Sequence, residues 1–75
     1  MDKPEDAIKE LKKAIKLDPA FAIAHNNLGT VYFGMAKYDD AITEFDQALQ
    51  LDPDFLEAKN NLKIAQDKKA VQQFT

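Results

Sequence analysis

Apolar positions recur every three or four residues in four stretches of this chain, which is the spacing of one face of an α-helix. In the first stretch the stripe ends at Leu17, and Pro4 suits the first turn of a helix. Asp18-Pro19 ends this helix, because proline disfavours helical geometry in the residue before it, and Asp52-Pro53 repeats the signal. The pattern predicts helices over about residues 4–17, 21–35, 38–51 and 55–74, with a turn at Gly34 to Lys37.

These short connections make successive helices antiparallel neighbours. The length of 75 residues allows a single domain over 1–75, and eleven alanines with only 2 glycines and 3 prolines favour helix throughout. We therefore predict an all-α fold. Its central hairpin should bury Leu28, Tyr32, Phe45 and Leu49 together.

Composition excludes several chemistries. The chain has no Cys, Ser or Arg, so it lacks a thiolate, a serine nucleophile and the guanidinium that reads phosphate bidentately. His25 is its only histidine, which predicts packing rather than a metal site or a catalytic base. We therefore expect no enzyme activity, no catalytic residue, no cofactor and no metal.

Charge and hydropathy bear on partners and location. A net charge of −3 and a pI near 4.9 argue against nucleic acid. No apolar run approaches the ~20 residues that span a membrane, and the first residues do not resemble a signal peptide. These features favour a cytoplasmic protein without a membrane or nucleic-acid partner.

The chain contains an internal duplication with a period of 34 residues. Asp6-Ala7-Ile8 recurs as Asp40-Ala41-Ile42, and Asn26-Asn27-Leu28 recurs as Asn60-Asn61-Leu62. Asp18-Pro19 likewise returns at 52–53, and more than half of positions 6–28 are identical in the second copy. A period of this length is typical of helical repeat arrays.

The stretch 22–55 resembles a tetratricopeptide repeat. All but the first of the signature positions carry the residue that the family prefers, and they fall at His25, Leu28, Gly29, Tyr32, Ala41, Phe45, Ala48 and Pro53. The exception is His25, where a large and often aromatic residue is usual. The resemblance implies an α-solenoid of antiparallel hairpins.

The resemblance covers the whole chain in a shifted phase. Residues 4–18 match the second helix of a partial repeat, 22–55 a complete repeat, and 55–74 a C-terminal capping helix, which gives the order B–A–B–A′. Lys63 and Gln66 stand where the family has Gly and Tyr, and further polar residues suit a cap at that end.

In this family the first helices of successive repeats line a concave groove that binds an extended peptide or a partner helix. By position, the groove here comprises Ile23, Asn26, Asn27, Thr30, Phe33, Glu57, Asn60, Asn61 and Ile64. Asn27 and Asn61 match the asparagine ladder of superhelical arms, whose amides can bind a peptide backbone. The alternative is that these amides are solvated or cap nearby backbone, and Phe33 fits either the groove rim or the hairpin turn.

Three other charged patterns have simpler explanations. A carboxylate clamp is rejected, since Glu57 and Asn61 stand where that clamp needs Lys and Arg. Asp39-Asp40 suit the positive end of a helix as dipole and capping residues. A basic stripe on the first helix predicts a solvated face: Lys9, Lys12, Lys13 and Lys16.

Two functions of different class follow. The first is a non-catalytic scaffold that binds a protein or peptide in the groove. The second is a structural or capping segment of a longer superhelix that stacks or self-associates. In the second case the unpartnered first helix exposes Ile8, Leu11 and Ile15, which predicts a homo-oligomer through this end or by helix exchange.

Overall fold

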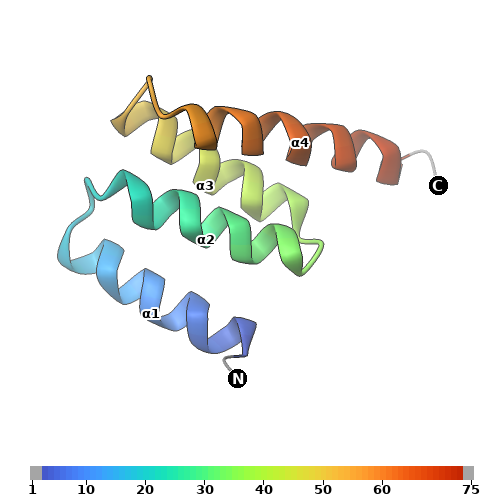
Figure 1. Cartoon of the computed structure of the whole chain (residues 1–75). Helices are drawn as coiled ribbons and strands as arrows, with labels where there is room; N and C mark the ends of the chain where they lie inside the picture. Colours follow the sequence, from blue (N-terminus) through green and yellow to red (C-terminus); the bar gives the residue numbers. More distant parts are fainter. Residues whose placement is uncertain (1–2, 74–75) are drawn as a thin grey trace.

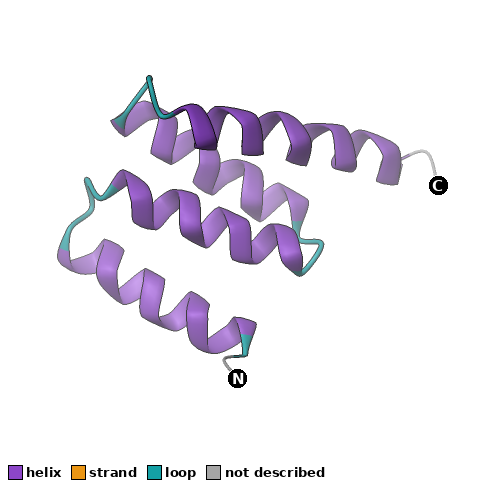
Figure 2. Cartoon of the chain, in the orientation of Figure 1, coloured by secondary structure: helices purple, strands orange, loops and turns teal. Residues whose placement is uncertain are grey.

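The computed structural model describes residues 3–73, which form four helices and no strands (Figures 1 and 2). The helices are α1 (Pro4–Leu17), α2 (Ala22–Gly34), α3 (Tyr38–Leu51) and α4 (Leu56–Gln73). Each packs antiparallel to the next, and α4 also contacts α2 directly, with α3 lying behind both (Figure 1). The smallest dimension of the molecule is 17 Å. The all-α prediction is confirmed.

The predicted helix limits agree with the structure to within one residue, apart from residue 74, which lies outside the described part. Asp18 and Asp52 leave helical geometry at nearly the same angles, φ −142° in both cases. Each carboxylate then accepts the N–H two residues on, from Ala20 at 3.3 Å and from Asp54 at 3.2 Å. The duplicated sequence therefore builds the same turn twice.

The turn between α2 and α3 begins later than predicted, because Gly34 is still helical. Ala36 adopts the left-handed conformation, with φ 60°, in place of a glycine. The Lys37 N–H donates to the Tyr32 carbonyl at 2.9 Å, and the Ala36 N–H donates to the Phe33 carbonyl at 3.0 Å. These two bonds define a Schellman motif. Its left-handed position is occupied by Ala36, whose Cβ makes this φ sterically unfavourable.

The core is thin and built largely of alanine. The buried apolar side chains are Ala24, Leu28, Ala41, Phe45, Ala48, Ala58 and Ala65. Tyr32 and Leu49 were predicted to be buried with Leu28 and Phe45 but are only half-buried. Tyr32 still packs against the core cluster formed by Ala41, Phe45 and Ala65.

Phe45 is the largest buried side chain, and it lies directly against Gly29 of α2. A Cβ atom on Gly29 would sit 2.6 Å from Phe45 Cε1, well inside contact distance. The absence of a side chain at residue 29 therefore sets how closely α2 and α3 approach.

Candidate functional site

The candidate site is the side of the layer formed by α2 and α4, the two first-in-hairpin helices. Helical periodicity places Ile23, Asn27 and Thr30 in one exposed row along α2. On α4 the facing row contains Glu57 and Ile64, both exposed, and the half-buried Asn61. The structure thus brings six of the nine predicted groove residues onto two facing helix surfaces.

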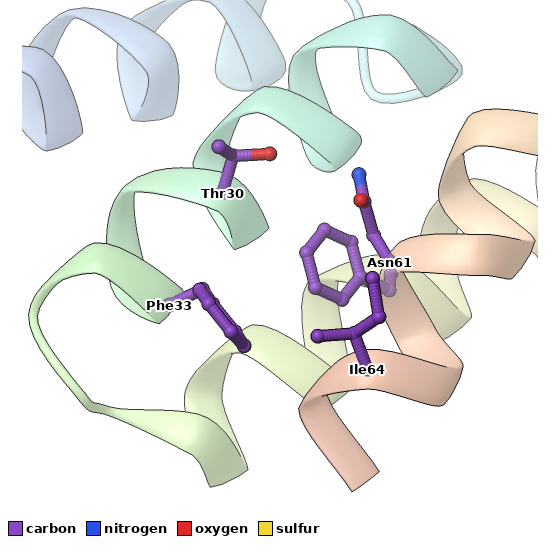
Figure 3. Close-up of a pocket in the computed structure, with 5 residues that line it drawn as sticks. Thr30, Phe33, Asn61 and Ile64 are labelled. Carbon is purple, nitrogen blue, oxygen red and sulfur yellow. The ribbon is translucent and has the colours of Figure 1, made fainter. Parts of the chain in front are cut away.

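A small pocket lies between these rows. Its volume is about 90 Å³, and its lining residues are Thr30, Phe33, Phe45, Asn61 and Ile64. Thr30 and Phe33 enter from α2, and Asn61 and Ile64 enter from α4 on the opposite side (Figure 3). The lining is mainly apolar with polar groups at one end, so the pocket suits one aliphatic side chain beside a hydrogen-bonding group.

Asn26 is another predicted groove residue on α2, and it is buried, with 1% of its surface exposed. Its Oδ1 accepts a hydrogen bond from Asn61 Nδ2 at 3.1 Å, and its Nδ2 donates to Glu57 Oε1 at 3.3 Å. The Thr30 hydroxyl donates to the Asn26 backbone carbonyl at 3.0 Å. One buried amide therefore joins α2 to α4 beneath the groove.

This network changes the role of the predicted asparagine pair. Asn27 is exposed and available, whereas the Asn61 amide nitrogen already bonds to Asn26. The Asn61 carbonyl oxygen has no hydrogen-bond partner among residues 3–73, so it remains a free acceptor at the pocket. Asn60 is exposed on α4 next to Asn61, outside both the network and the pocket lining.

Phe33 takes both of the positions that the sequence left open. Its ring is half-buried against Tyr38 in an edge-to-face arrangement, with centroids 5.3 Å apart and planes at 61°. The same ring lines the pocket (Figure 3). Packing against the start of α3 therefore fixes a pocket wall.

His25 lies on another side of α2 and does more than fill space. Its Nδ1 is 2.9 Å from Glu44 Oε1 on α3, and its Nε2 is 3.2 Å from the Pro19 carbonyl. Both partners are acceptors, so each ring nitrogen that carries a hydrogen donates it to the acceptor it faces. His25 thus ties α2 to α3 and to the turn after α1, a role that the sequence did not reveal.

The acidic start of α3 agrees with the dipole part of the prediction, but the capping part is wrong. No side-chain capping bond forms at this helix start, whose N-cap is Lys37. Asp39 instead pairs with Lys69 of α4. Dipole compensation and a cross-helix ion pair therefore replace capping. The four lysines of the basic stripe on α1 are all exposed.

Antiparallel helix pairs repeated at a fixed interval around alanine and a buried ring define a helical-repeat solenoid. A family model described as a TPR repeat matches residues 3–35, and one described as a tetratricopeptide repeat matches residues 22–55. The chain belongs to the tetratricopeptide repeat family, as the resemblance indicated. Members of this family generally mediate protein–protein interactions as non-catalytic scaffolds.

A comparison with curated protein sequences gave no significant match. None of the described helices has the length and apolar character needed to cross a membrane.

Proposed function

We propose that this chain binds an extended peptide along the face between α2 and α4, with one aliphatic peptide side chain in the pocket. The observation that carries the proposal is the pocket itself. An apolar wall of Phe33 and Ile64 stands beside the free carbonyl of Asn61. Asn27, exposed on the α2 row, supplies a second amide for the peptide backbone.

The chemistry of the groove bears on selectivity. Amides bind backbone groups whatever the peptide sequence, and the pocket favours an aliphatic side chain. Glu57 is the acid of the α4 row, and it disfavours an acidic peptide terminus. Only two helices contribute, so the dissociation constant should fall at about 10 μM to 1 mM.

The test is titration of the labelled protein with aliphatic-rich peptides, followed by NMR chemical shifts. Ile64→Glu places a charge at the pocket and should remove the peptide-induced shifts. Val71→Glu makes the same change at another exposed aliphatic residue of α4, outside the pocket lining, and should leave them intact. Equal shifts in both variants would place the ligand elsewhere.

The amides need a separate pair of variants, because Asn61→Ala would also strip Asn26 of its partner. Asn27→Ala removes an exposed amide without touching the network, and Asn60→Ala is its matched control on α4. We expect weaker binding from Asn27→Ala only. Identical affinities would refute backbone recognition by Asn27.

A second candidate function is that of a structural segment that stacks on further helices. The observation in its favour is that none of the residues of α1 is buried, although Ile8, Leu11 and Ile15 are apolar and half-exposed. Covering these apolar side chains with a neighbouring helix lowers the free energy of the assembly. A chain that binds no peptide but self-associates would support this candidate over the first.

A further inference from the structure

Equivalent positions of the two repeat copies differ sharply in burial. In α3, Ala41, Phe45 and Ala48 are 0–1% exposed. Their counterparts 34 residues earlier on α1 are Ala7, Leu11 and Ala14, and all three are half-exposed. The cause is that α3 lies between α2 and α4, whereas α1 packs only against α2 among the described helices. One face of α1 is therefore open.

This open face contains a depression with acidic residues at its edge. A depression of about 420 Å³ is lined by Asp6, Ala7, Glu10 and Leu11. Helical periodicity puts Leu17, which is 80% exposed, on the same side of α1. An apolar floor with two carboxylates at its edge suits a helix that presents aliphatic stems and positive charges.

The helix α4 presents such a face. Lys59, Lys63 and Gln66 are all exposed, and periodicity places them together on the side away from the peptide groove. Leu62 lies half-buried at the edge of this face. The corresponding face of α2 carries His25 and Gly29 and packs against α3, but on α4 it is uncovered by residues 3–73.

The intact hairpin supplies a template for joining the two open faces. Within it, His25 of α2 pairs with Glu44 of α3 at 2.9 Å. A shift of one repeat turns His25 into Lys59 and Glu44 into Glu10. Lys59 and Glu10 are exposed, and neither has an ion-pair partner among the described residues. The register of α2 on α3 would thus bring a lysine to a glutamate.

The close approach at Gly29 has no equivalent across these two faces. Lys63 replaces Gly29 in this register, and Leu11 replaces the ring of Phe45. The helices would pack less closely than α2 and α3 do. The lysine stem would cover the apolar floor while its charge extends toward the acidic rim. This geometry predicts a weak and salt-sensitive contact.

We propose that the open face of α1 binds α4 of a second copy of this chain, head to tail, so that the two helices complete a composite repeat. The proposal is independent of peptide binding in the groove, and it names an occupant for the open face of α1. Because the two surfaces are different, the contact is heterologous, and in the register of α2 on α3 it continues the solenoid from one copy to the next. Each added copy leaves the same free ends, so the assembly grows without a fixed size.

The test is sedimentation at protein concentrations up to about 1 mM in low salt. We expect the average mass to rise past that of a dimer without a plateau, and to fall on addition of salt. A strict monomer, or a plateau at the dimer mass, would overturn the proposal. The second result would indicate a closed contact such as helix exchange.

Charge reversal identifies the faces. Glu10→Lys and Lys59→Glu should each weaken self-association at least tenfold, because each sets like charges opposite one another. An equimolar mixture of the two variants should regain wild-type association, since the lysine introduced into one chain then meets the glutamate introduced into the other. No recovery in the mixture would refute the pairing of these two positions.

Matched controls change the same charges on other faces. Glu5→Lys lies on a different side of α1, and Lys68→Glu lies on the groove side of α4; both residues are exposed. We expect both controls to associate as the wild type does. Peptide titration of Glu10→Lys distinguishes the two proposals. Because the groove does not involve residue 10, this variant should bind peptide as the wild type does.

Discussion

Replacement of Gly29 by alanine tests the closest helix contact in the fold. The added Cβ would lie 2.6 Å from Phe45 Cε1 and 2.7 Å from Phe45 Cδ1, whereas ordinary contacts begin at 3.4 Å. The ring or the helix must therefore move by 3.4 − 2.6 = 0.8 Å. Phe45 is 1% exposed and has the fully buried Ala41 and Ala48 on its own helix, so a displaced ring disturbs the core or intrudes on the pocket that it lines.

The magnitude follows from two opposing effects. Overpacking of a closely packed core costs roughly 1–3 kcal/mol, and this site belongs in the upper half of that range. Alanine gains about 1 kcal/mol over glycine inside a helix. We expect a net loss of about 1–2 kcal/mol, which lowers the melting temperature of a domain this small by roughly 5–15 °C.

Gly34 provides the matched control within the same helix. A Cβ there meets no atom within 4 Å, and the residue is the last of α2. Gly34→Ala should therefore raise stability by up to about 0.5 kcal/mol. Urea unfolding monitored by circular dichroism compares the two variants directly. If Gly29→Ala proves as stable as Gly34→Ala, the close approach of α2 and α3 does not constrain residue 29.

A double-mutant cycle isolates the contact from general effects of the substitution. Phe45→Leu removes the ring, so Gly29→Ala should cost at least about 1 kcal/mol less in that background than in the wild type. Additive effects would mean that the ring is not the obstacle.

Three further stability measurements follow from the same structure. Ala36→Gly should stabilise by about 0.5–1 kcal/mol, because glycine adopts the left-handed conformation without the Cβ clash, and a lower urea midpoint would contradict this. Asn26→Ala should lower the free energy of unfolding by about 1–3 kcal/mol, because the amide of Asn61 and the carboxylate of Glu57 lose this partner. Its control, Asn60→Ala, should change that free energy by no more than about 0.5 kcal/mol. Glu44→Ala should cost about 1–2 kcal/mol, and Glu44→Gln should cost less because its amide oxygen still accepts from His25; equal losses would show that charge, not the hydrogen bond, dominates.

The local sequence was enough to predict the helices. Proline after aspartate stopped two of them in the same way, and apolar spacing placed the others. The exception was the α2–α3 turn, which was predicted to include Gly34. Gly34 has an ordinary helical φ, and the left-handed residue falls two positions later, at Ala36. A glycine in the sequence shows only where a left-handed backbone conformation is permitted. The hydrogen bonds of the turn determine which residue adopts it.

The contacts between α2 and α4 could not be predicted from the sequence. Adjacent asparagines at 26 and 27 occur in both repeat copies, so neither pattern nor duplication distinguishes them. Their side chains point about 100° apart on the helix, and only the position of α4 decides which one is covered. The same limit applies to His25, whose two partners lie on separate segments.

The buried Asn26 has a consequence for the shape of any longer array. Apolar contacts tolerate sliding, but hydrogen bonds of 3.1 and 3.3 Å hold α2 and α4 at one separation and one offset along their axes. That offset is the step from one hairpin to the next, and its repetition sets the pitch of a superhelix. A leucine at residue 26 could keep the helices together and still let the pitch drift. The curvature of the solenoid thus depends on this amide as well as on the packing of α3 against both helices.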